Sequence, residues 1–276
     1  MNTQRLKLQL LSEVPTQSED RRLDELRAAA LFEIGRLHAL RGRSHAGEVA
    51  TARAIALYDA LVTVDPSNTS WRASGVVARL ELADQLSTQR QYDQARRVLR
   101  VVQPDVKQIA QVDTERTGRR IEVLGRWLLV SLACDPADAS IGEAAQAYAS
   151  SVDRAISEGT DLDGDQRKIV AEVGLLLGDS AARNGHTDRA QSRWGAALRV
   201  LELLVKYDDA EAQVIAARLA LRTNQTDLAA RLRERLRNHA LAHGRLRLLD
   251  QELRSKPRHL RQLPARHVHT ANAFRS

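Results

Sequence analysis

Four acidic residues match the spacing of a calcium-binding loop. They stand at positions 1, 3, 5 and 12 of the twelve-residue template: Asp161, Asp163, Asp165 and Glu172. Such spacing would place four carboxylates around one hard cation. However, position 6, which requires a glycine for a sharp turn, is Gln166, and Arg167 and Lys168 add positive charge. We therefore interpret the acids as capping groups of a helix that starts near Gln166, and not as metal ligands.

Two pairs of histidines are further candidates for metal ligands. His239 and His243 are four residues apart, which puts them on one face of a helix, but no carboxylate or cysteine completes a set. His267 and His269 lie in a segment without helical spacing. We predict neither a metal nor a cofactor.

No motif of a known catalytic class is present in the sequence. Gly174 and Gly178 fall on a predicted helix with no Lys-Ser or Lys-Thr after them, so we expect them to serve close packing and not phosphate binding. Cys134 ends the apolar run 127–134, where a small hydrophobe is the expected role. Nucleophile elbows, kinase signatures and zinc-protease motifs are absent. We predict that the chain is not an enzyme; a helical enzyme with an unrecognised site is the third interpretation.

Positive charge is concentrated at the C-terminus. The net charge is +7, and six cations lie in the last 23 residues without an acid among them: Arg254, Lys256, Arg258, Arg261, Arg266 and Arg275. Such a tail either holds nucleic acid or another anionic partner electrostatically, or is a disordered, solubilising end. Phe274 is the one aromatic available there for stacking on bases, which disfavours single-strand binding.

The sequence indicates neither a leader nor a membrane span. Residues 1–14 place Arg5 and Lys7 among leucines, unlike a secretory signal, and no run approaches the ~18 apolar residues of a span. The single cysteine fits a reducing compartment. We therefore expect a cytoplasmic protein.

The composition predicts an all-α fold. Leu, Ala and Arg dominate, aromatic residues are 3% of the chain, and apolar residues recur at helical spacing. Thr16 and Glu19 form a capping-box pattern before a first helix that runs to Gly42. Further helices are expected at 48–64, 69–88, 92–102, 106–133, 141–157, 166–183, 188–207, 210–222, 227–242 and 246–253. Pro66, Pro104 and Pro136 are expected to mark helix ends.

A small residue followed four positions later by a bulky one recurs five times on these helices. The pairs are Ala54/Tyr58, Ala95/Leu99, Ala144/Tyr148, Ala190/Trp194 and, more weakly, Ala229/Arg233. A recurring step of this kind is typical of repeat proteins, in which stacked units share one core. The alanine permits close approach of two helices, and the bulky residue fills the gap one turn later.

With these steps, the chain resembles the tetratricopeptide repeat family. The fourth unit matches best, with Leu177-Gly178, Ala181, Ala190 and Trp194; Ile34-Gly35 and Leu124-Gly125 open the first and third units. The resemblance implies a right-handed superhelical solenoid of about five antiparallel helix pairs. The matched alanines are 41, 49, 46 and 39 residues apart, whereas the family's unit has about 34, so a HEAT-like solenoid with a period of about 40 to 47 is the alternative.

The resemblance also implies a concave groove lined by the first helix of each pair. The residues after the Leu-Gly positions would point into it: Arg36, Asp84, Arg126, Asp179 and Arg218. Their alternating sign suits either a protein or peptide partner of mixed charge or ion pairing within the stack, Arg36 with Asp84 and Arg126 with Asp179. We slightly favour the pairing.

These observations predict four regions. They are an N-terminal segment (1–22), a repeat domain (23–242), a C-terminal capping helix (243–254) and a basic, disordered tail (255–276). Residues 64–71 are similar to repeat regions attached to bacterial kinases, ATPases and transcription regulators. We predict a non-catalytic protein-interaction scaffold, the docking or sensing arm of a bacterial signalling or regulatory system. The alternative is a nucleic-acid-associated regulator that binds through the basic C-terminal region.

Overall fold

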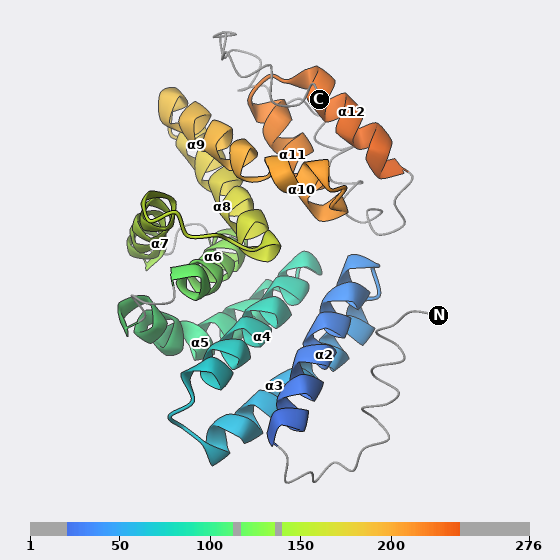
Figure 1. Ribbon diagram of the computed structural model, residues 1–276, viewed down its shortest axis with the longest axis vertical. Coiled ribbons are helices and arrows are strands. Elements are labelled where there is room, and N and C mark those ends of the chain that lie inside the picture. Colours follow the sequence, from blue (N-terminus) through green and yellow to red (C-terminus); the bar gives the residue numbers. More distant parts are fainter. Residues whose placement is uncertain (1–20, 113–116, 136–139, 238–276) are drawn as a thin grey trace. The chain divides into compact units, whose positions relative to one another are not determined.

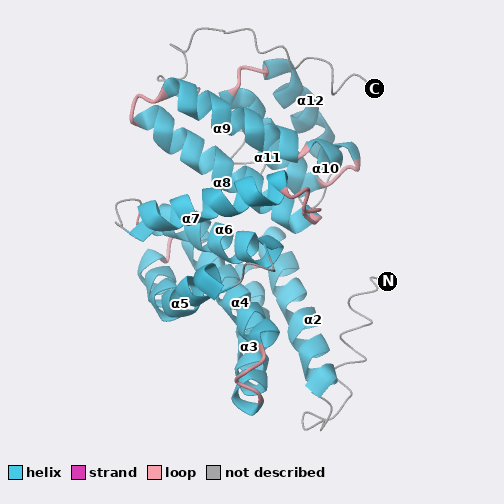
Figure 2. Ribbon diagram, turned by 60° about the vertical axis from the view of Figure 1, so that its left-hand side comes forward, coloured by secondary structure: helices cyan, strands magenta, loops and turns pink. Residues whose placement is uncertain are grey.

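The chain is helical throughout the part that the structure describes. The computed structural model describes residues 21–112, 117–135 and 140–237, which contain eleven helices and no strand (Figures 1 and 2). The described residues fall into two compact units, one ending at Ser157 and the other beginning at Glu158. The predicted all-α class is therefore confirmed.

The first unit consists of three consecutive helix pairs. Its helices are α2 (Arg21–Leu40), α3 (Ser44–Val64), α4 (Thr69–Thr88), α5 (Tyr92–Val112), α6 (Thr117–Cys134) and α7 (Ser140–Ser157). Each helix packs against the next one, and α4 also packs against α2 and α6. Figure 1 shows α2, α3 and α4 side by side. The first helices of neighbouring pairs, α2, α4 and α6, thus contact one another in turn, as in stacked helical repeats.

The second unit repeats this arrangement with two helix pairs and a short extra helix. It contains α8 (Gly164–Arg183), α9 (Thr187–Val200), α10 (Glu202–Lys206), α11 (Ala210–Arg222) and α12 (Thr226–Arg237). The paired helices α8/α9 and α11/α12 pack together, and α11 also contacts α8 and α9. The predicted helix 188–207 is interrupted at Leu201, whose N–H bonds Leu198 O, three residues back, at 3.2 Å.

Turn residues mark the ends of several helices. Asn68 accepts a hydrogen bond from Trp71 N at 3.1 Å and so caps α4. Gly185, after α8, and Asn224, after α11, have positive φ values of 80° and 57°. Glycine and asparagine tolerate this left-handed conformation, which directs the chain into the following helix.

Pro104 does not end a helix, contrary to the prediction. Helix α5 continues through it from Tyr92–Val112, and the next helix begins at Thr117 and not at 106. Proline lacks the N–H that would bond the carbonyl of Arg100, but the helix is long enough to tolerate one missing bond. Burial supports this continuation, because Val102 and Val106 on either side of Pro104 are 0% and 3% exposed.

The small-then-bulky steps lie in the core. Ala54, Ala95, Ala190 and Ala229 are all 0% exposed, and the bulky members of the first four steps, Tyr58, Leu99, Tyr148 and Trp194, are at most 8% exposed. Ala144 is half-buried. Full burial of a ring as large as that of Trp194 contributes about 4 to 6 kcal/mol. The prediction that these steps form the packing between helices is confirmed for the first, second and fourth pairs.

Two glycines of the repeat pattern mark close helix contacts. A Cβ on Gly178 would overlap the indole of Trp194, and one on Gly35 would overlap the hydroxyl of Thr51. The indole also donates from Nε1 to Leu175 O at 3.3 Å, which fixes its orientation against α8. The Leu-Gly positions of the pattern therefore provide room for a side chain of the paired helix.

Candidate functional site

The five predicted groove residues lie on the first helices of the pairs. Arg36, Asp84 and Arg126 belong to α2, α4 and α6 of the first unit, and Asp179 and Arg218 belong to α8 and α11 of the second. All five are half-buried. A half-buried charged side chain is generally paired, and Arg36, Arg126 and Asp179 have ion-pair partners described below.

Arg126 belongs to a polar network that joins α4 and α6. Its Nη1 donates to Oε2 of Glu81 at 3.2 Å, and its Nε lies 3.5 Å from Oε1 of Glu122. The side chains of Arg126 and Glu81 are only 14% and 8% exposed. This pair is therefore shielded from solvent, and its Coulomb attraction is screened less than that of an exposed pair.

The same network continues from Glu81 to the preceding helix. Gln85 donates from Nε2 to Oε1 of Glu81 and to Oγ1 of Thr51, each at 3.2 Å. Thr51 is 0% exposed and lies against Gly35 of α2. The network thus links α3, α4 and α6 of the first unit through polar groups, and Thr51 also packs against α2.

Asp179 has an equivalent partner in the second unit. It accepts from Nε and Nη2 of Arg222 at 3.2 and 3.0 Å, and this two-point contact joins α8 to α11.

Lys168 of α8 lies within a cluster of three carboxylates. Its Nζ is 2.8 Å from Asp165, 3.5 Å from Asp209 and 3.2 Å from Glu211. Burial alone would lower the pKa of Lys168, but the three carboxylates outweigh it and raise the pKa.

The ion pairs of these groove residues join different partners from those that the sequence suggested. Arg36 pairs with Glu33 at 3.2 Å on its own helix, whereas Arg126 and Asp179 pair with Glu81 and Arg222. The sequence analysis did not identify Glu81 and Arg222 as ion-pair partners of the groove residues. Their signal in the sequence was the separation of 45 and 43 residues from their partners, which is close to the spacing of the matched alanines.

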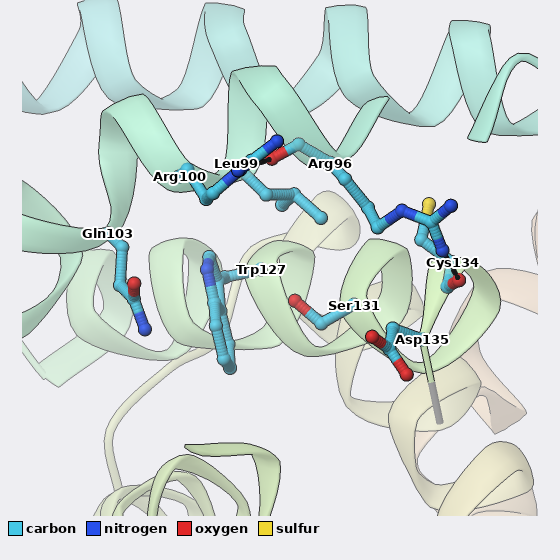
Figure 3. A pocket seen from close by; sticks show the side chains of 8 residues that line it. All are labelled: Arg96, Leu99, Arg100, Gln103, Trp127, Ser131, Cys134 and Asp135. Atoms are coloured by element: carbon cyan, nitrogen blue, oxygen red, sulfur yellow. Dashed lines mark hydrogen bonds between the residues drawn. The ribbon is translucent and has the colours of Figure 1, made fainter. Parts of the chain in front are cut away.

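A pocket lies between α5 and α6 in the first unit. Its volume is about 330 Å³, and eight residues line it: Arg96, Leu99, Arg100, Gln103, Trp127, Ser131, Cys134 and Asp135 (Figure 3). The sequence analysis did not single out this pocket, because its residues are separated along the chain by the length of a whole helix. The helical spacing of Arg96, Leu99 and Gln103 on one face was the available signal.

One end of the pocket is closed by Arg96. It donates from Nη1 to Cys134 O at 3.1 Å and from Nη2 to Asp93 at 2.6 Å. A guanidinium in this position neutralises the partial negative charge at the C-terminal end of α6. Burial raises the pKa of the Cys134 thiol, which disfavours the thiolate form of this cysteine.

The acidic residues of the calcium-loop pattern have structural roles. Asp163 caps α8 and forms a capping box with Gln166, while Asp161 pairs with Arg167 at 3.1 Å and Asp165 pairs with Lys168. The capping interpretation is confirmed for Asp163. Across residues 21–112, 117–135 and 140–237, no group of three or more potential ligands is placed to hold a metal.

The predictions for the two ends of the chain fall outside the described residues. They concern the cap at Thr16 and Glu19, the pairs His239/His243 and His267/His269, the capping helix 243–254 and the basic tail from Arg254 to Arg275. Among the helices that are described, none has both the length and the apolar character needed to cross a bilayer.

Comparison with known proteins leaves the geometry as the basis for a functional assignment. No family, curated protein or solved structure matches the chain.

Proposed function

We propose that the chain is a non-catalytic protein-interaction scaffold built as a tetratricopeptide-like right-handed solenoid. The observation that carries this proposal is the regular contact between first helices, α4 with α6 and α8 with α11. Polar contacts between first helices span about one repeat length in each unit, with Glu81 and Arg126 separated by 45 residues and Asp179 and Arg222 by 43. Such stacks present an extended surface that suits protein or peptide partners.

The separations favour long repeat units. They exceed the roughly 34 residues of an ordinary tetratricopeptide unit and fall in the range of HEAT-like repeats. The helices account for the excess, because α3, α4 and α5 have 21, 20 and 21 residues. The proposal of a repeat scaffold holds for either type of unit.

Within this proposal, Arg36 and Arg218 are the groove residues chosen to test contact with a partner. Arg126 and Asp179 hold neighbouring first helices together, so their replacement would test folding more than binding. A role as docking or sensing arm of a bacterial signalling or regulatory system rests on the resemblance of residues 64–71 alone. In the structure this segment includes the turn between α3 and α4, where Asp65 accepts from Ser67 and Asn68 caps α4.

Affinity capture from an extract of the native cell tests the scaffold proposal. The full chain is immobilised and compared with an Arg36→Glu/Arg218→Glu variant and with an Arg97→Glu/Arg235→Glu control, whose altered residues are exposed on the second helices α5 and α12. We expect a captured protein to be lost with the first variant and kept with the control. Equal capture by both variants would show that the first helices do not form the binding surface.

A further inference from the structure

We propose that the pocket between α5 and α6 binds a small organic carboxylate. Trp127 and Arg100 would hold the carboxylate, and the apolar part would lie against Leu99 and the tryptophan ring. The pocket contains none of the five groove residues, so this site is distinct from the surface proposed for the protein partner.

The size of the pocket points to a ligand. The pocket is a hollow between two helices that is partly open to solvent, so a ligand can enter it. A volume of about 330 Å³ is at the lower end of the range for small-molecule sites, about 300 to 1,000 Å³. Its inner wall is preformed, because Leu99, Trp127 and Ser131 are 8%, 4% and 4% exposed.

The indole of Trp127 provides the sharpest indication of a missing ligand atom. Its Nε1 is buried and has no hydrogen-bond acceptor among the described residues. Leaving such a donor unsatisfied is costly, and the same fold does satisfy the buried indole of Trp194, which donates to Leu175 O. In Figure 3 the Trp127 side chain lies between those of Gln103 and Ser131, inside the pocket. An acceptor atom of a ligand there would complete the hydrogen bond.

The charged groups that line the pocket favour an anionic acceptor. Arg100 uses Nε for a 3.4 Å hydrogen bond to Arg96 O, and no carboxylate in the described ranges pairs with its guanidinium. Gln103 adds an amide next to Trp127. Asp135, the one acidic residue among those that line the pocket, lies at the opposite end beside Cys134 (Figure 3). A carboxylate accepts from an arginine and from neutral N–H donors together, which matches this set.

Benzoate is a suitable probe because it joins a carboxylate to a flat apolar ring. The full chain, with ¹⁵N-labelled tryptophan, is titrated with benzoate, neutral benzamide and cationic benzylamine. The Trp127 indole resonance is assigned by its loss in Trp127→Phe. We expect a saturable shift of this resonance with benzoate, binding of benzamide that is weaker by roughly tenfold or more, and no shift with benzylamine.

A matched pair of variants tests the role of the guanidinium. Arg100→Gln removes the charge at the pocket, and Arg97→Gln removes an exposed charge from the same helix outside the pocket. We expect Arg100→Gln to weaken benzoate binding by roughly tenfold to a hundredfold and Arg97→Gln to leave it unchanged, with equal urea midpoints for both.

The source of the carboxylate is tested with a capped tripeptide that carries a central glutamate. Tighter binding of the peptide than of benzoate would assign the carboxylate to a side chain of a protein partner, and the reverse would assign it to a free acid; either result supports a carboxylate site. The proposal is overturned if neither carboxylate gives a saturable shift, if benzamide binds as well as benzoate, or if Arg100→Gln binds benzoate like the unaltered chain.

Discussion

Arg126 on α6 donates to Glu81 on α4 across a helix contact in which both side chains are largely buried, 14% and 8% exposed. The two residues are 45 apart in the chain. Their pairing, together with the bonds of Gln85 to Glu81 and Thr51, fixes the alignment of neighbouring helix pairs. A buried pair of this kind contributes more to alignment than to net stability, because desolvation offsets much of its Coulomb energy.

We expect removal of one member of this pair to be strongly destabilising. Arg126→Met leaves the Glu81 carboxylate buried without its main cation, which should lower the free energy of unfolding by about 3 kcal/mol. Glu81→Met/Arg126→Met should recover much of the loss, since no buried charge is left uncompensated. Urea unfolding followed by circular dichroism measures both values. A double variant whose loss equals the sum of the losses in Arg126→Met alone and Glu81→Met alone would contradict the coupling.

Close packing at Gly178 gives a second prediction. Gly178→Ala places a Cβ against the Trp194 indole, and we expect a loss of about 1 to 3 kcal/mol in the free energy of unfolding. Gly142→Ala is the matched control, because a Cβ there meets no atom within 4 Å and alanine has the higher helix propensity. The control should be neutral or stabilising by about 0.5 to 1 kcal/mol. Equal effects of the two changes in thermal melts would argue against the contact.

The Lys168 cluster predicts a dependence of stability on alkaline pH. The carboxylates of Glu211, Asp165 and Asp209 raise the folded-state pKa of Lys168 above its ordinary value of 10.5. The contribution of the Lys168 charge to the free energy of unfolding is therefore complete below the unfolded-state pKa. It is lost as the pH rises through the folded-state pKa. Lys168→Met should lower the free energy of unfolding by about 2 kcal/mol at pH 7.

The difference between the unaltered chain and Lys168→Met isolates this group from other groups that titrate in base. We expect the difference to be constant from pH 6 to 9 and to shrink above about pH 10.5. Lys168→Arg, which stays charged in this range, should keep its stability at a pH where the unaltered chain has lost the contribution. A stability difference that grows with pH would contradict a raised pKa of Lys168 in the folded state.

The continuous helix through Pro104 gives a fourth prediction. Pro104→Ala restores an N–H that can bond the Arg100 carbonyl, and Pro104 is exposed, so we expect a gain of about 1 to 3 kcal/mol in the free energy of unfolding. Hydrogen exchange at the backbone amides of the residues that flank position 104 should become slower. If the helix instead ended before Pro104, as the sequence suggests, alanine would change stability by less than about 0.5 kcal/mol.

Much of the fold was predictable because its signals are local. Apolar spacing, the caps at Asn68 and Asp163, and the turns at Gly185 and Asn224 act within a few residues, and the helices that they bound agree with the structure to within a few positions. The buried positions of the small-then-bulky steps follow from the same periodicity. Pro104 was the exception, because the packing of Val102 and Val106 outweighs a local helix-breaking preference.

The sequence by itself determined the all-helical class, most helix ends and the residues that pack between helices, because these depend on local propensity and spacing. Only the tertiary structure decided which charges meet. Arg126 pairs with Glu81, and Asp179 pairs with Arg222, because helix packing brings together residues about one repeat apart. The pocket, which is lined by Arg100 and by Trp127 with its unsatisfied indole N–H, likewise arises only where α5 and α6 come together. A void between two helices is a property of their packing and not of either helix alone.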